Sequence, residues 1–180
     1  YGNLIGQVKK NMFVNHPYRW ATIGSMEHLD AATLEEFQAF NKKFYAPNNA
    51  VLVIAGQMDV AKTKEWVQKY FGPIPRGQEI KREKFVEDPI TTQLNATYED
   101  PNIQKPMIVA SYRTPSMKTR DARVLDMIST ILSDGKSSRL YKKIVDDKKM
   151  ALQIGAFSFN QEDYGMYILY GMPQGENTAA

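Results

Sequence analysis

The chain has 180 residues, of which 43% are hydrophobic and 24% charged, proportions typical of a folded globular protein and not of a disordered one. Its formal net charge of +3 comes from 23 basic and 20 acidic residues that are interleaved, so nucleic acid is not predicted as a partner. The absence of cysteine excludes disulfides and thiolate ligands, and no apolar run reaches the roughly 18 residues of a membrane-spanning helix.

The first predicted helix lies between Asp30 and Pro47. Residues 16–29 are expected to be irregular because a proline and a glycine interrupt them. Asp30 is expected to be the N-cap of the helix, and the apolar residues that follow recur at helical spacing. Pro47 predicts that this helix stops near Tyr45.

A strand and a second helix are predicted next. The run NAVLVIAG, residues 49–56, is continuously apolar and ends in glycine, which favours a buried strand. Asp59 is expected to cap a helix that ends at Gly72-Pro73.

The segment 72–89, GPIPRGQEIKREKFVEDP, has the composition of a linker. It carries proline and glycine, then dense charges of alternating sign, and shows no apolar period. We therefore predict a first domain in residues 1–74, a linker in 75–89 and a second domain in 90–180.

Strands and helices are predicted again beyond this linker. We expect strands at 91–100 and 105–114, a helix over 119–133, a second helix capped by Ser137 or Ser138, and a hairpin of strands 151–160 and 164–172. The order of elements predicts an α+β fold with segregated helices, not a doubly wound sheet.

The sequence GSMEH, residues 24–28, differs from the zinc-peptidase motif H-x-x-E-H only at Gly24. With two histidines and no cysteine, a zinc site would need both His16 and His28 together with carboxylates. His28 is expected at a loop end just before Asp30, where Glu27 and His28 could not share a helical face. We therefore predict no metal ligand in this chain.

Two other motifs carry no assignment. GKSS, at the end of SDGKSS (133–138), resembles the end of a phosphate-binding loop, but Thr130 stands where that motif needs a glycine and a helix precedes it. We predict a turn between helices there. A Ser/His/Asp triad is not excluded by spacing, although only two histidines are available.

Three stretches, in this order, resemble the pitrilysin/insulinase-type (inverzincin) zinc metallopeptidases, whose relatives include the mitochondrial processing peptidases. They are HPYRWATIGSMEHLDAATLEEFQAFNKKFYAPNNAVLVIAGQMD, VQKYFGPIP and SSRLYKKIVDDKKMALQ. The resemblance implies two homologous domains, each a mixed sheet backed by helices, and both incomplete in this chain.

The resemblance also implies where the chemistry lies. In the family, H-x-x-E-H and a later glutamate hold zinc, and these residues would precede Tyr1, so no catalytic, substrate-binding or metal residue is assigned here. The family's non-zinc half carries an arginine and a tyrosine at positions that match Val145 and Leu152, which cannot donate a hydrogen bond. Arg139 is not that arginine, and we expect it to be structural. The missing pair indicates the zinc-bearing half.

We therefore expect an internal segment of a zinc metalloendopeptidase that cleaves peptides or unfolded proteins, contributes chamber wall and scaffold, and is inactive alone. The alternatives are a non-catalytic scaffold or partner subunit of the same family, and a module that binds peptides at a strand edge. The implied partners are the parent's peptide substrate and a second homologous half or subunit. Only the resemblance suggests a location, the bacterial periplasm or envelope.

Overall fold

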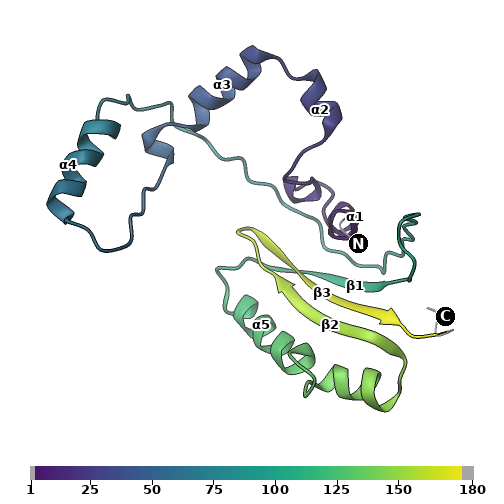
Figure 1. The fold of residues 1–180 in the computed structure, drawn as a ribbon. Helices are drawn as coiled ribbons and strands as arrows, with labels where there is room; N and C mark the ends of the chain where they lie inside the picture. Colours follow the sequence, from purple (N-terminus) through teal and green to yellow (C-terminus); the bar gives the residue numbers. More distant parts are fainter. Residues whose placement is uncertain (1–2, 176–180) are drawn as a thin grey trace. The chain divides into compact units, whose positions relative to one another are not determined.

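The computed structural model describes residues 3–175, which fall into two compact units. Unit 1 combines the part of the chain up to Trp20 with the part from Glu87 onward, and unit 2 is Ala21–Val86. The chain therefore leaves unit 1 and later returns to it. The predicted α+β class is confirmed, since helices accompany one antiparallel sheet (Figure 1).

The sheet of unit 1 has three strands, β1 (Ile108–Pro115), β2 (Ala151–Phe159) and β3 (Tyr164–Pro173). Their order is β1-β3-β2, and both pairs are antiparallel. The hairpin predicted from the sequence is β2–β3, and the predicted strand at 105–114 is β1. These predictions are confirmed.

Two helices cover opposite faces of this sheet (Figure 1). Helix α1 (Leu4–Met12) packs on the face that carries Met166 and Ile168, both essentially buried, and Phe13 completes this core. Helix α5 (Arg120–Ser133) packs on the other face and is capped by Thr119, whose hydroxyl accepts the Ala122 N–H. The apolar side chains of α1 and the alternate residues of β3 thus form one continuous core.

The helix predicted after α5 is present, but its predicted cap is wrong. A π-helix, η3 (Tyr141–Asp147), follows the turn at Gly135, whose φ of +72° suits glycine. Ser138 contributes its backbone carbonyl to the Lys142 N–H, while its buried hydroxyl has no hydrogen-bond partner among the described residues. The hydroxyl faces the interior and therefore caps nothing.

Unit 2 contains α2 (Met26–Ala31), α3 (Leu34–Phe44), the 3-10 turn η2 (Pro47–Asn49) and α4 (Val60–Phe71), and a similar turn, η1 (Pro17–Arg19), belongs to unit 1. The predicted cap at Asp59 is confirmed, because its carboxylate accepts the Lys62 N–H. The predicted cap at Asp30 is wrong. Asp30 lies inside α2, and Thr33 caps α3 through a reciprocal capping box with Glu36.

The predicted strands at 49–56 and 91–100 are not formed among the described residues. A strand exists only where its backbone groups pair with a neighbour, and these extended segments have none. In the first segment the residues Val51 and Val53 are 91% and 81% exposed. The linker predicted at 75–89 has no helix or strand, but Glu87 within it belongs to unit 1. The division into two homologous domains stays a prediction.

Helix α5 is joined to the edge strand β2 by Ser133. Its hydroxyl lies 2.8 Å from the Ala156 carbonyl oxygen, to which it donates, and 2.9 Å from the Ala156 amide nitrogen, from which it accepts. The hydroxyl of Ser129, one turn earlier, donates to the carbonyl of Leu125 within the helix, and the backbone carbonyl of Ser129 lies 3.2 Å from the Ser133 hydroxyl.

We predict that Ser133→Ala lowers the free energy of unfolding by about 1–3 kcal/mol, because two strand groups lose their partner. Ser129→Ala is the matched control and should change stability by less than about 0.5 kcal/mol. Urea unfolding followed by circular dichroism measures both. Equal effects of the two substitutions would show that the link between α5 and β2 contributes nothing.

Candidate functional site

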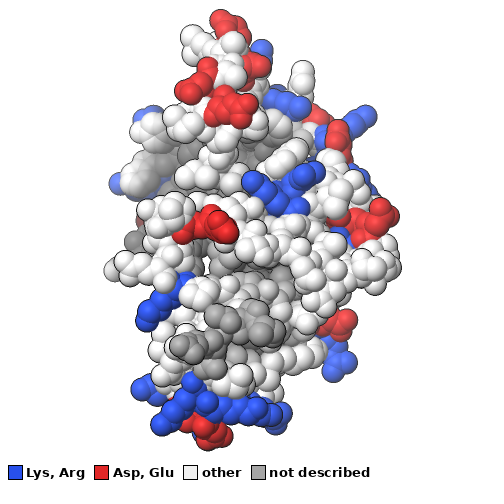
Figure 2. All heavy atoms as spheres, turned by 90° about the vertical axis from the view of Figure 1, so that its right-hand side faces the viewer, with Lys and Arg blue, Asp and Glu red and all other residues white. Residues whose placement is uncertain are grey.

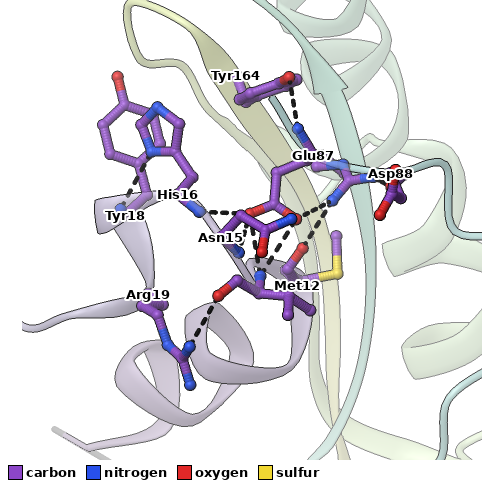
Figure 3. Close-up of polar contacts among 10 residues, drawn as sticks. Met12, Asn15, His16, Tyr18, Arg19, Glu87, Asp88 and Tyr164 are labelled. Carbon is purple, nitrogen blue, oxygen red and sulfur yellow. Dashed lines mark hydrogen bonds and ion pairs between the residues drawn. The ribbon is translucent and has the colours of Figure 1, made fainter. Parts of the chain in front are cut away.

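The carboxylate of Glu87 is buried in unit 1 and accepts hydrogen bonds from several backbone amides (Figure 3). Its Oε1 atom accepts three consecutive backbone N–H groups, those of Val14 at 3.0 Å, Asn15 at 2.7 Å and His16 at 2.6 Å. The side chain of Glu87 is only 2% exposed. The carboxylate thus replaces the water that these amides would otherwise bind.

A single arginine neutralises this carboxylate. The Nη1 atom of Arg113 lies 3.0 Å from Oε2 of Glu87 and also donates to the Met12 carbonyl at 3.1 Å. Its Nη2 atom donates to the carbonyl of Asp88. The hydroxyl of Tyr164 accepts the N–H of Glu87 at 3.1 Å. We call this group, formed by Met12, Val14–His16, Glu87, Arg113 and Tyr164, the Glu87 clamp.

Local sequence explains why the three amides point at one place. Helix α1 ends at Met12, so the amides that follow lie outside its regular hydrogen bonding. Pro17 favours an extended backbone in the residue before it, and His16 has φ −78° and ψ 140°. The chain therefore turns away from the helix and presents successive N–H groups to one carboxylate oxygen.

The Glu87 carboxyl is ionised because of these contacts. Burial by itself raises its pKa, but the hydrogen bonds from the His16, Val14 and Asn15 amides and the charge of Arg113 outweigh burial. The pKa of Glu87 therefore lies below its ordinary value near 4.5. The bonds of this carboxylate join the segment that follows α1 to the segment around residue 87.

His16 is also committed to internal contacts. The side chain is 4% exposed, its Nδ1 accepts the Tyr18 N–H at 3.2 Å, and its Nε2 lies 3.2 Å from Oδ2 of Asp163. Since Nδ1 acts as acceptor, the neutral ring carries its proton on Nε2 and donates it to Asp163. The ring further packs against Tyr18, with 4.0 Å between centroids.

The side chains present do not fit zinc. A protein zinc site takes at least three His, Cys, Asp or Glu ligands, and residues 3–175 contain no such group. Both nitrogens of His16 are already engaged, and His28 lies exposed in α2. The expectation that His28 sits at a loop end is wrong, because Ser25 caps α2 and accepts the His28 N–H. Gly24 has φ +79°, a conformation that suits glycine in a turn.

The other residues singled out from the sequence lie apart from the clamp. Val145 is half-buried on η3, Leu152 is 43% exposed on β2, and Arg139 is exposed just before η3. Val145 and Leu152 can donate no side-chain hydrogen bond, as expected. A structural role for Arg139 stays a prediction.

Sequence reasoning did not single out the central residues of the clamp. Glu87 stands in a densely charged segment where one more carboxylate carries no signal. Arg113 did offer one, because it lies on the same sheet face as Val109 in a strand of alternating pattern. An inward-facing arginine requires a buried partner, although the sequence does not say which.

Charged groups elsewhere are mixed in sign. On the face shown in Figure 2, basic and acidic side chains are interspersed, and the basic group at its lower end has acidic residues beside it. Within the described part of the chain, no helix is both long and apolar enough to cross a bilayer.

Known proteins resemble the chain over most of its length. A sequence model of the family described as Peptidase M16 inactive domain matches residues 31–180. The zinc protease PqqE of Helicobacter pylori is 30% identical over 152 residues, which cover 83% of this chain and 34% of that protein. The uncharacterized zinc protease YmxG of Bacillus subtilis is 21% identical over 169 residues, covering 91% of this chain and 39% of that protein.

Solved structures share the fold. A crystal structure of a protease from Helicobacter pylori matches with a TM-score of 0.78 at 24% identity and covers 97% of this chain and 43% of that one. A chain in the complex III2 structure from Candida albicans, with Inz-5 bound, matches with a TM-score of 0.71 at 14% identity, covering 96% and 42%. At these identities the likeness concerns the fold alone.

Fold and site together define an α+β structure whose described residues hold a buried ion pair and no cluster of metal ligands. The chain belongs to the Peptidase M16 inactive domain family, which confirms the resemblance stated from the sequence. It spans about a third of the length of the curated relatives PqqE and ML0855 of Mycobacterium leprae, both named zinc proteases.

We predict that Glu87→Gln lowers the free energy of unfolding at pH 7 by about 3 kcal/mol, because the Arg113 charge loses its buried partner. A carboxyl with a lowered pKa stabilises the fold above its unfolded pKa, and this contribution disappears as the pH falls through the folded value. The difference between wild type and variant should therefore shrink below about pH 4.5. Urea unfolding at pH 7 and at acidic pH measures it.

The matched control is Glu162→Gln. Glu162 forms an ion pair with Lys118 at 2.8 Å, and these side chains are 52% and 69% exposed. An exposed pair contributes less than about 1 kcal/mol. A Glu87→Gln effect that is no larger than the control, or that is independent of pH, would refute the electrostatic account of the clamp.

Proposed function

We propose that this chain is a segment of a zinc-dependent metalloendopeptidase that cleaves peptides or unfolded proteins, and that it supplies scaffold and part of the chamber wall. The observation that carries the proposal is the family match over residues 31–180, combined with the absence of a metal-ligand cluster among residues 3–175. Relatives at up to 30% identity are named zinc proteases. The metal and its bound water would then be held by residues other than these.

The exposure of unit 2 supports a role as part of a larger body. Of its described residues, Ala46 is the only buried hydrophobic one, whereas α3 and α4 carry exposed apolar side chains such as Phe37, Phe40 and Trp66. Apolar side chains of Leu52, Ile54 and Val67 line a cavity of about 460 Å³ between the extended segment and α4. Exposed apolar side chains that lie together in this way mark a surface that other protein normally covers.

A second candidate is a non-catalytic scaffold or partner subunit of the same family. Two observations favour it: the matching family is described as an inactive domain, and one structural relative is a chain of a complex III2 assembly. The two candidates differ in whether the complete protein hydrolyses peptides.

We predict that the 180-residue chain binds no zinc at a stoichiometric site and hydrolyses no peptide. His16 is occupied by Tyr18 and Asp163, and no three-ligand group stands among the described residues. Calorimetric titration with zinc and a fluorogenic peptide assay measure the two properties, with His28→Ala as a control for weak surface binding. Stoichiometric zinc that is lost on His16→Ala would overturn the assignment of the metal site to other residues.

For the longer protein that contains these residues, we predict an H-x-x-E-H motif and a later glutamate ahead of Tyr1, one bound zinc ion, and peptide hydrolysis that stops when the motif glutamate becomes glutamine. Sequencing of the longer coding region, metal analysis and a peptide digest test this. A longer protein that lacks the motif and binds no zinc would favour the scaffold alternative.

A further inference from the structure

The chain passes out of unit 1 and back into it, so a conformational change in the intervening residues could reach the sheet of unit 1 from two sides. The polypeptide leaves unit 1 after Trp20 and re-enters it at Glu87. Everything between belongs to unit 2, which buries little apolar surface of its own. Local unfolding of a poorly packed segment spreads along the chain until it meets stronger contacts.

Those stronger contacts stand at the point of re-entry. Glu87 is the first residue of the returning chain in unit 1, and its hydrogen bonds span 71 to 73 residues of sequence to reach Val14–His16 on the departing chain. Arg113, near the C-terminal end of β1, bonds to the departing chain at Met12 and to the returning chain at Asp88. The ion pair of Glu87 and Arg113 therefore joins both the segment that precedes unit 2 and the segment that follows it to the sheet.

The departing chain is held at further points. Arg19 donates to the carbonyl of Val14 at 2.7 Å, and the hydroxyl of Tyr18 accepts the Asp163 N–H at 3.3 Å. Asp163 belongs to the turn between β2 and β3 and also contacts His16. These contacts lie wholly within unit 1 and need nothing from residues 21–86.

We propose that the Glu87 clamp isolates the sheet of unit 1 from conformational changes in residues 21–86, by fixing together the two points where the chain leaves and re-enters. Unit 2 can then open, refold or be covered by other protein while β1, β2 and β3 keep their packing. The clamp is a conformational device of the chain itself, and it operates whether or not the longer protein is a peptidase.

Hydrogen exchange of the complete 180-residue chain in increasing urea tests the clamp. In the wild type, the amides of Val14, Asn15 and His16 should exchange in the same opening as those of β3, while α3 and α4 exchange in an opening of lower free energy. In Glu87→Gln, the exchange rate of the amides of residues 14–16 should rise at least tenfold relative to that of the β3 amides. These amides should then exchange in the same opening as α3 and α4. In Glu162→Gln, the amides of residues 14–16 should still exchange in the same opening as β3.

Two results would overturn the proposal. One is a wild-type chain in which residues 14–16 already exchange with α3 and α4. The other is a Glu87→Gln chain in which they stay with β3. If Glu87→Gln does not fold, Arg113→Lys provides the same comparison. Lysine keeps the charge but replaces the two guanidinium nitrogens, one bonded to Met12 and Glu87 and the other to Asp88, with a single ammonium nitrogen. If neither variant folds, the wild-type exchange pattern decides alone.

Discussion

A carboxylate removed from water must find its hydrogen bonds inside the protein, and Glu87 finds them on the amides that follow α1. Three N–H groups and a guanidinium offset the cost of burying the charge. The result is a contact between two distant parts of the chain that tolerates little displacement, since amide and carboxylate must meet at hydrogen-bond distance. The core around Phe13 and Met166 packs beside it, so apolar burial and the ion pair fix the same arrangement.

The two units differ in how much of their stability is internal. Unit 1 closes a core between α1 and the sheet, and ties α5 to β2 through Ser133. Unit 2 has well-capped helices but exposes most of their apolar residues. Good caps set where helices begin, yet they do not replace a packed core, because most helical stability in proteins comes from burial of one face. The exposed faces fit the proposal that these residues work inside a larger protein.

The chain belongs to the Peptidase M16 inactive domain family. Its described residues contain no group of three possible metal ligands. Two buried polar residues of unit 1 bond within the protein. His16 forms hydrogen bonds with Tyr18 and Asp163, and Glu87 bonds to backbone amides and to Arg113. Groups bonded in this way hold the shape of unit 1. The proposed role of this chain as scaffold rests on the family match and on these internal contacts.

The sequence by itself determined the α+β class, the family, the hairpin of β2 and β3, and the caps or ends of α4 and α5, because these depend on local periodicity and on residues close in sequence. It misplaced the cap of α3, since Asp30 and Thr33 are both good caps and only Thr33 has a glutamate three residues later. It also predicted strands at 49–56 and 91–100, because apolar or alternating runs do not reveal whether a neighbour exists. Only the tertiary structure joined Glu87 to Val14–His16, more than seventy residues away, and to Arg113, 26 residues away. Contacts between residues so far apart in sequence are decided by packing, which no local pattern encodes.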